Sequence, residues 1–463
     1  MHSDVPSRLD ALGWSRWHKR VIVALGITWI LDGLEASLIS ALGATLQDPR
    51  TLGLSATQVG FTSTAYLAGQ VLGALVFGHL TDRHGRKRLF LVTLALYLVS
   101  TALSGLAPNL AVFVVFRFFA GAGIGGEYAA INSAIDELVP ARLRGQVDLG
   151  INGSYWVGAA MAFGLSLVVL DPAIVPIEHG WRIAFGLGSL LGLAILIIRR
   201  HVPESPRWLL LHDRHDEARE VVATIEEAAG GLPKDVVLAS VRIHVKRPQG
   251  LGALIHTLFV RYPRRAILGV VLMLSQAFLY NAIFFSYPLV LKTFHGVSPK
   301  DVGLYGLPFA AANFMGPLLL GRMFDRVGRR SMISATYALS GVLLAITGAL
   351  FVAGLLDAVT QTICWSVVFF FASAAASSAY LTVSELFPLE LRGMAIAVFY
   401  AFGTSIAAIA PTLFGMFVDT GNPVSVFHGY LLATLLMCIA AVVARTHGVD
   451  AEGRSLEELN PHD

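Results

Sequence analysis

The sequence predicts an all-α membrane protein with 12 transmembrane helices in two pseudo-symmetric six-helix bundles. Its composition, its recurring apolar runs and a repeat of loop motifs all indicate this fold. Of 463 residues, 55% are hydrophobic and 14% are charged, whereas soluble domains carry roughly 25% charged residues. The mean hydropathy is +0.66. So few charges cannot cover a water-facing surface, which excludes a soluble enzyme and a disordered chain. The net charge of +3 indicates no nucleic-acid partner.

Apolar runs of the roughly 20 residues needed to cross a bilayer recur along the chain. In the first half we expect spans at about 21–46, 57–81, 88–107, 110–138, 144–170 and 181–201, from run length alone. In the second half we expect them at about 264–293, 301–324, 329–354, 358–387, 391–418 and 424–445. We therefore divide the chain into an interfacial lead-in (1–20), an N-terminal bundle (21–201), a linker with short helices (202–263), a C-terminal bundle (264–445) and a tail (446–463).

Basic residues in the loops predict the orientation. Arg86, Arg144, Arg326 and Arg392 all fall in loops that would face one side, together with the basic lead-in. The loops of the opposite side carry few basic residues. Because cytoplasmic loops are enriched in Lys and Arg, we expect a multi-pass protein of the inner (plasma) membrane with both termini and the linker in the cytoplasm.

Two loop motifs occur once in each half. Asp82-Arg83-His84-Gly85-Arg86 returns as Asp325-Arg326-Val327-Gly328-Arg329, and the segment Glu137–Gly145 returns as Glu385–Gly393. Both pairs keep the same order and the same position relative to the spans. The halves are therefore parallel copies, as expected of transporters whose halves rock around a site at the bilayer midplane.

The repeated loops carry charges that can form a cytoplasmic gate. An aspartate can accept hydrogen bonds at a helix N-terminus of the opposite half, where the helix dipole favours an anion. The arginines can pair with glutamates near the same surface. An alternative is that these charges only anchor the helices at the headgroups. The predicted gate residues are Asp82, Arg83, Arg86, Glu137, Arg144, Glu204, Asp325, Arg326, Arg329, Glu385 and Arg392.

These motifs carry a family resemblance. Together with the segment Pro203–Trp208, the paired D-R-x-G-R and E-x-x-P-x-x-x-R-G motifs resemble the major facilitator superfamily, and within it the sugar porters and the related metabolite–proton symporters and organic-ion porters. Gly453–Glu458 resembles the end of the sugar-porter tail motif. The resemblance implies the major facilitator fold, transport by alternating access, and short linker helices that brace the gate.

Charged side chains inside spans are costly and are therefore functional candidates. Asp32 and Glu35 share one face of the first span, and the fourth span carries Arg117 and Glu127. At a rise of about 1.5 Å per residue, Glu35 and Arg117 lie at matching depth. A carboxylate–arginine pair there can act as a proton switch, and the resemblance implies that Glu35 occupies the position of the sugar porters' proton-binding aspartate and Arg117 that of its partner. There are two alternatives: the pair is a static ion pair, or Asp32 carries the proton in place of Glu35.

The second half has few charges inside its spans, so a substrate site there must use neutral groups. The expected substrate contacts are Gln276, Tyr280, Asn281, Asn313, Tyr380 and Tyr400 of the second half, to which the fifth span of the first half adds Asn152 and Tyr155. The sugar-binding pattern of the resembled family is eroded, because Ser275 and Ala159 stand where glutamines are expected. An unpaired buried hydroxyl is costly, so a hexose is disfavoured. We expect a small, partly aromatic organic acid, imported with protons and docking near Arg117.

Other functions remain open at this stage. A proton-driven exporter of drugs or metabolites and a sugar- or polyol–proton symporter would use the same machinery. A non-transporting membrane sensor would need a signalling domain larger than the linker. A membrane-embedded enzyme would need a nucleophile–base or metal set, which the sequence lacks, so we expect no enzyme, cofactor or metal. The expected partners are a small-molecule substrate, protons and the lipid bilayer, with the monomer as the functional unit.

Overall fold

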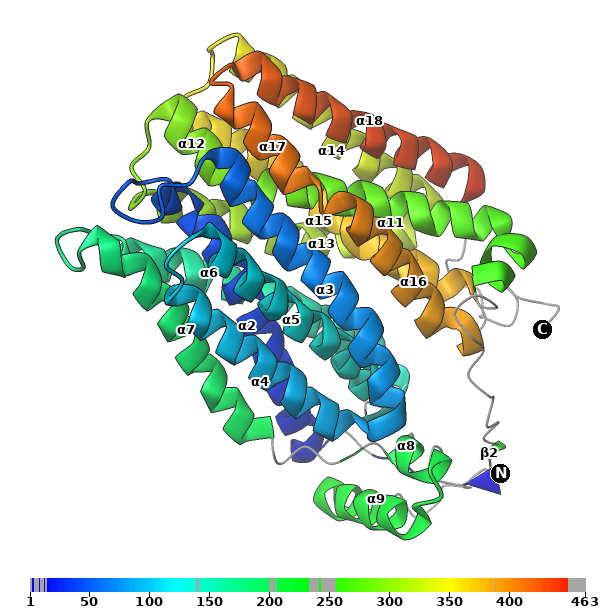
Figure 1. Cartoon of the computed structure of the whole chain (residues 1–463). Coiled ribbons are helices and arrows are strands. Elements are labelled where there is room, and N and C mark those ends of the chain that lie inside the picture. Colours follow the sequence, from blue (N-terminus) through cyan, green and yellow to red (C-terminus); the bar gives the residue numbers. More distant parts are fainter. Residues whose placement is uncertain are drawn as a thin grey trace.

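The computed structural model describes residues 15–138, 141–199, 206–232, 255–387 and 389–448, together with residues 2, 3, 8, 12, 204, 241 and 242. Within the helices and strands, some side chains lie outside the description, namely those of 2, 3, 17, 24, 25, 79, 81–84, 86, 128–150, 152, 194–199, 207, 211, 241, 242, 325, 381, 384–386, 389–394 and 396. The described part is almost entirely helical (Figure 1). Its strands are β1 (His2–Ser3) and β2 (Val241–Arg242), which pair antiparallel.

Six long helices form the first half of the molecule. They are α2 (Arg16–Leu46), α3 (Ala56–His84), α4 (Arg86–Gly105), α5 (Leu110–Leu138), α6 (Ala141–Val169) and α7 (Ile177–Arg199). Between α3 and α4 the chain reverses at Gly85, whose φ of +92° favours glycine. Two short helices follow, α8 (Pro206–Leu211) and α9 (His215–Ala229).

A π-helix, η1 (Thr257–Arg261), lies at the end of the linker. The helices of the second half are α11 (Pro263–Phe284), α12 (Tyr287–His295), α13 (Val302–Arg326), α14 (Arg329–Val352), α15 (Ala358–Leu386), α16 (Leu389–Ala407), α17 (Ala410–Asp419) and α18 (Pro423–His447). Two of the predicted spans each consist of two helices. The breaks precede Pro288 in the first turn of α12 and Pro411 in the first turn of α17, because proline donates no helical hydrogen bond. Between α13 and α14 the chain reverses in the same way at Gly328, whose φ is +105°.

Ten stretches of the described chain are long and apolar enough to cross a membrane. The segment Gly153–Val169 of α6 is a shorter apolar stretch, and part of α7 lies outside the described side chains. Each half packs its own helices together, chiefly α3 on α5 and α2 on α6 in the first half and α14 on α18 and α13 on α15 in the second. The arrangement matches the predicted all-α membrane fold.

Glycines bring α3 and α5 into close contact. A Cβ atom on Gly121 would lie 1.9 Å from the Tyr66 carbonyl oxygen, and one on Gly125 would lie 1.9 Å from that of Gln70. Gly69 and Gly73 of α3 face carbonyls of α5 in the same way. Small residues of this kind let membrane helices approach closely.

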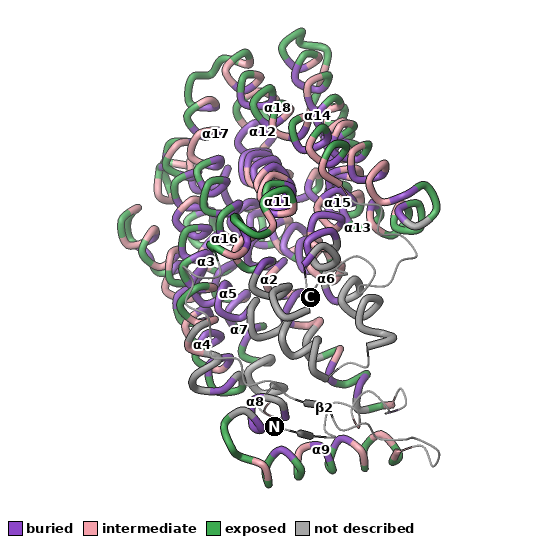
Figure 2. The backbone as a smooth tube through the Cα atoms, turned by 90° about the vertical axis from the view of Figure 1, so that its right-hand side faces the viewer, coloured by how far each residue is buried: buried purple, intermediate pink, exposed green. Residues whose placement is uncertain are grey.

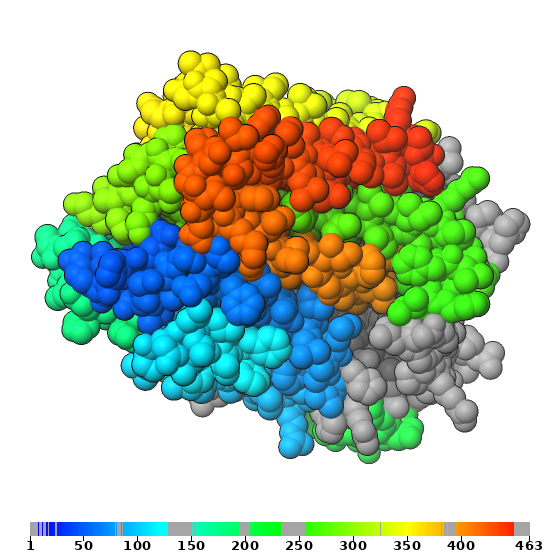
Figure 3. All heavy atoms as spheres, turned by 45° about the horizontal axis from the view of Figure 1, so that its top comes forward, coloured from blue at the N-terminus to red at the C-terminus, as the bar shows by residue number. Residues whose placement is uncertain are grey.

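The two halves contact each other most extensively at one end, which we call the distal end. It contains the loops at 47–55, 170–176, 296–301, 353–357 and 420–422, and it lies opposite α8 and α9. There α3 packs on α17, α6 on α13 and α2 on α12. In Figure 3 the orange surface of α16 and α17 lies directly against the blue surface of α3.

The linker helix α9 is amphipathic, with Ala218, Val222 and Ile225 buried and its other face exposed (Figure 2). The Arg8 guanidinium forms an ion pair of 2.6 Å with Glu226. α9 also contacts α2. The linker is therefore packed onto the first half at the end opposite the distal end.

Candidate functional site

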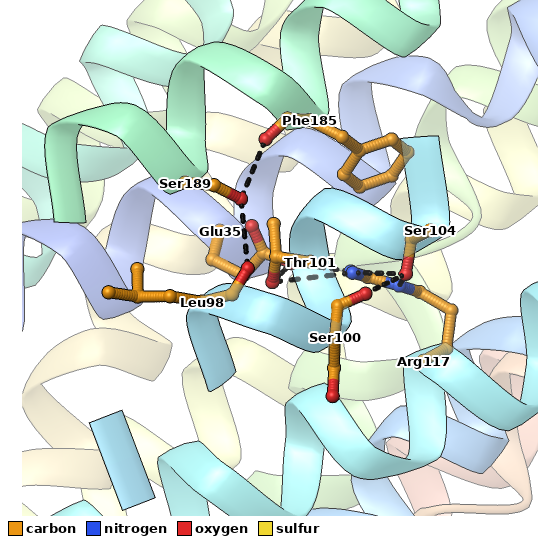
Figure 4. A network of polar contacts seen from close by, with 8 residues as sticks. All are labelled: Glu35, Leu98, Ser100, Thr101, Ser104, Arg117, Phe185 and Ser189. Atoms are coloured by element: carbon orange, nitrogen blue, oxygen red, sulfur yellow. Dashed lines mark hydrogen bonds and ion pairs between the residues drawn. The ribbon is translucent and has the colours of Figure 1, made fainter. Parts of the chain in front are cut away.

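A buried ion pair joins α2 to α5 inside the first half. Arg117 Nη1 lies 2.5 Å from Glu35 Oε1, and neither side chain has any exposed surface. Thr101 of α4 donates a 3.0 Å hydrogen bond to the same Glu35 oxygen. Ser104 of α4 accepts from Arg117 Nε at 3.0 Å and from Nη2 at 2.8 Å (Figure 4). Three helices thus meet at this pair. The contact between Glu35 and Arg117 is the one that their matched depths predict.

Aromatic rings close the space around Arg117. Its guanidinium carbon lies 4.6 Å from the centre of the Phe185 ring and 5.8 Å from that of Phe113. Glu35 Oε2 is buried and has no hydrogen-bond partner among the described residues. Glu35 therefore retains one free, shielded oxygen that can take a proton while Oε1 stays bonded to Thr101.

Asp32, one turn before Glu35, has a different environment. Its side chain is only partly buried, and its Oδ1 is shielded from solvent without a hydrogen-bond partner in the described part of the chain. It lies within electrostatic range of the hydroxyls of Tyr66, Tyr155 and Tyr400. Tyr400 belongs to the second half, so Asp32 faces the junction between the halves.

An aromatic cluster crosses the same junction. The Trp156 ring of α6 lies 6.2 Å from Tyr280 and 6.1 Å from Phe284, both of α11. Tyr155 packs edge-on against Trp156 at 5.2 Å, and Tyr280 packs edge-on against Phe369 at 4.9 Å. Trp156, Tyr155 and Tyr280 keep partly exposed side chains. The cluster can therefore contact a planar or apolar solute between the halves.

The model of the family described as "Sugar (and other) transporter" matches residues 32–462. The chain belongs to this family of transporters. The predicted membership of the major facilitator superfamily is thereby confirmed, together with the transporter class and the prediction that the protein is not an enzyme. As a member of this family, it is an integral, multi-pass membrane protein.

The relatives of this transporter carry different substrates. The chain is 27% identical over 458 residues to the niacin transporter NiaP of Acinetobacter baylyi, covering 98% of this chain and 99% of that one. It is 26% identical to the major myo-inositol transporter IolT of Bacillus subtilis, covering 87% and 88%. Among solved structures, it resembles the D-xylose–proton symporter with a TM-score of 0.73 at 21% identity, covering 94% and 99%. The last likeness establishes the fold.

The remaining predicted contacts of the transporter fall in several places. Tyr280 donates to Asn313 Oδ1 at 2.7 Å, and Asn313 in turn donates to the Phe309 carbonyl. Asn281 donates to the Ala407 carbonyl at 3.4 Å, at the break between α16 and α17. Gln276 is buried on α11. Glu127 is buried on α5, about 15 Å along the helix from Arg117.

Two more predicted contacts, Tyr380 and Tyr400, lie near each other on α15 and α16, with ring centres 6.4 Å apart. The side chain of Asn152 lies outside the described residues. Trp156 and Phe369 were missed by the sequence reasoning, which selected polar side chains. The only signal for Trp156 was its position directly after Tyr155.

Most of the predicted cytoplasmic gate lies outside the described side chains, namely Asp82, Arg83, Arg86, Glu137, Arg144, Asp325, Glu385 and Arg392. Glu204 is described, and it accepts from the backbone amide of Lys87 at 3.2 Å, at the first turn of α4. Arg326 is exposed and Arg329 is partly buried. The interaction of Glu204 joins the linker to the first half and does not cross between the halves.

The distal end of the transporter holds polar contacts that the sequence reasoning missed. Asp419 at the end of α17 accepts from the amides of Ala56 and Thr57 at 2.8 Å each, and from the Thr57 hydroxyl at 2.6 Å. Lys292 of α12 donates to the Ala44 carbonyl of α2 at 2.8 Å. Ser40 of α2 donates to the Phe284 carbonyl. Each of these bonds joins one half to the other.

Proposed function

We propose that the protein is a proton-coupled secondary transporter that moves a small organic metabolite inward by alternating access. The observation that carries this proposal is the fully enclosed Glu35–Arg117 pair. A buried carboxylate without a charge partner favours its neutral form, whereas a neighbouring guanidinium favours the anion. Proton binding at Glu35 would therefore be controlled by whether the pair is closed or open to water.

Helix α2 links this pair to the contacts between the halves. Glu35 lies on α2, and further along the same helix Ser40 and Ala44 bond to residues of the second half. Neutralising Glu35 would leave Arg117 as an uncompensated buried charge, which is unfavourable by roughly 3–5 kcal/mol. A displacement of α2 that admits water to Arg117 would relieve this cost. The same displacement would strain the contacts at the distal end.

We infer that residues 21–201 and 264–445 are the two moving units. The protein lies in the inner membrane with both termini on the cytoplasmic side. In that orientation the distal end faces outward, and its hydrogen bonds hold the outer side closed. The loops of the predicted cytoplasmic gate would then lie at the side where the halves separate.

The sequence-based expectation of an organic acid depended on Arg117 as a docking cation. In the structure Arg117 has no exposed surface, and its nitrogens donate to Glu35, Ser104 and Thr101. A substrate carboxylate therefore has no route to it in this conformation. The substrate class must follow from groups that face the junction between the halves.

The test is uptake by purified protein in liposomes with an inward proton gradient. Niacin and myo-inositol are the first probes, because relatives of the chain transport them, and phenethylammonium is added as an organic cation. We expect Glu35→Gln to abolish accumulation driven by the gradient while exchange of labelled for unlabelled probe continues. Glu178→Gln, at an exposed carboxyl in the first turn of α7, is the matched control. Accumulation by Glu35→Gln at the wild-type level would refute the coupling role.

A further inference from the structure

Asp32 is a carboxylate at the junction between the halves whose Oδ1 has no hydrogen-bond partner among the described residues. This oxygen is also shielded from water. The nearest acidic group, Glu35, adds repulsion. The guanidinium of Arg117, which could compensate Asp32, is already bonded to Glu35 and Ser104.

Tyrosines from both halves lie within electrostatic range of this carboxylate. Tyr66 of α3 and Tyr155 of α6 come from the first half, and Tyr400 of α16 comes from the second. The Tyr66 hydroxyl is also buried without a hydrogen-bond partner among the described residues. The electrostatic partners given for Tyr66 and Tyr155 are acidic or tyrosine side chains. Asp32 Oδ1 and the Tyr66 hydroxyl are thus two unsatisfied buried polar atoms within electrostatic range of each other.

This arrangement has a defined chemical preference. An unpaired carboxylate in a partly dehydrated site is unfavourable unless a cation or a strong hydrogen-bond donor joins it. Aromatic faces attract cations, particularly where water is excluded. An anionic solute would be repelled by Asp32, and a polyol would need more directed acceptors than these aromatic faces offer.

We propose that Asp32, Tyr155 and Tyr400 form the binding site for the protonated nitrogen of a small organic cation with an aromatic or apolar body. The nitrogen donates to Asp32, and the body of the molecule lies against the Trp156–Tyr280 pair. Because Asp32 and Tyr400 belong to different halves, the bound cation bridges them. This inference deepens the proposed transport function and rests on it for the movement of the ligand, but binding is measurable without any gradient.

The experiment measures binding to the full-length protein in lipid nanodiscs at pH 7 by calorimetry. The probes share one skeleton and differ in charge: phenethylammonium, neutral 2-phenylethanol and anionic phenylacetate. We expect phenethylammonium to bind at least tenfold more tightly than the other two. This comparison uses the wild-type protein alone, so it does not depend on the folding of a variant.

Variants then locate the charge that is responsible. Asp32→Asn should weaken phenethylammonium binding at least tenfold and leave 2-phenylethanol unchanged, whereas Asp32→Glu should restore part of the affinity. Glu178→Gln, at an exposed site on α7, should bind as the wild type does. Tighter binding of phenylacetate than of phenethylammonium, or no binding of phenethylammonium, would overturn the proposal.

An outcome in which Asp32→Asn keeps full affinity for phenethylammonium but loses proton-driven uptake would also overturn it, because Asp32 would then be a proton carrier. Failure of the coupling role appears separately, as gradient-driven accumulation by Glu35→Gln in liposomes. The two results are independent, since calorimetry is carried out without a gradient.

Discussion

Asp419 at the end of α17 accepts hydrogen bonds from both the backbone amide and the hydroxyl of Thr57, in the first turn of α3. The two residues belong to different halves and are 362 positions apart. A carboxylate at a helix N-terminus satisfies amides that the helix itself leaves free and interacts favourably with the helix dipole. The contact therefore stabilises the closed distal end without a paired basic side chain among the described residues.

We predict that Asp419→Asn opens the distal end. The amide side chain keeps one acceptor oxygen but loses the charge, so the closed arrangement should be weakened by about 1 kcal/mol, in the range of capping contacts. Spin labels at Ile174 and Leu355, which are exposed distal sites of the first and second halves, would report the separation of the halves. The distance distribution should shift toward longer values.

Asp357 provides a matched control for this variant. It caps α15 by accepting from the amide of Thr360 within its own half. Asp357→Asn should therefore leave the distances between the two labels unchanged. Equal shifts in Asp357→Asn and Asp419→Asn would mean that capping in general, and not the contact between halves, controls the opening.

The spans could be predicted because each apolar run is long enough to cross a bilayer by itself. The Glu35–Arg117 contact followed from helix rise, since two charges at equal depth in neighbouring helices of one bundle pair readily. The breaks before Pro288 and Pro411 lie inside continuous apolar runs, and hydropathy is insensitive to them. The contacts of Trp156 and Asp419 depend on how the two halves pack, and no local pattern in the sequence encodes the partner.

We predict strong non-additivity between Glu35 and Arg117 in stability. Arg117→Leu alone leaves Glu35 buried without its charge partner, whether it stays ionised or takes up a proton, and should destabilise the fold by roughly 3–5 kcal/mol. The double variant Glu35→Leu with Arg117→Leu replaces both charges with apolar groups and should recover most of that loss. Thermal unfolding in detergent compares the wild type, Arg117→Leu, Glu35→Leu and the double variant. Additive losses would show that the two side chains act independently.

A pH dependence is expected at the distal end from His295. Burial lowers the pKa of its imidazole, with a smaller opposing effect of Asp357, and its ring lies 5.8 Å from Phe351 of α14. The unfolded chain, with an ordinary pKa near 6.5, binds the proton more readily. Stability should therefore be complete above about pH 6.5 and fall as the pH drops through the folded-state pKa.

The measurement for His295 is thermal unfolding between pH 7.5 and pH 5. His295→Gln should lower the slope of unfolding temperature against pH in this window, because it removes one group whose pKa changes on folding. His447, which lies in the last turn of α18, gives the control His447→Gln, and the slope of this variant should equal that of the wild type. An unchanged slope in His295→Gln would place the pH dependence elsewhere.

Close helix packing predicts a difference between two glycines of α6. A Cβ atom on Gly158 would lie 1.7 Å from the Ile30 carbonyl oxygen of α2, whereas one on Gly164 would meet nothing within 4 Å. Gly158→Ala must therefore push α6 away from α2, at a cost of roughly 1–3 kcal/mol, typical of overpacking. Gly164→Ala should be neutral or slightly stabilising, since alanine favours the helix.

Because α2 carries Glu35, Gly158→Ala should also reduce proton-driven uptake. Thermal unfolding and liposome uptake are measured for both glycine variants. Equal behaviour of the two variants would show that the α2–α6 contact is not tight in the working transporter.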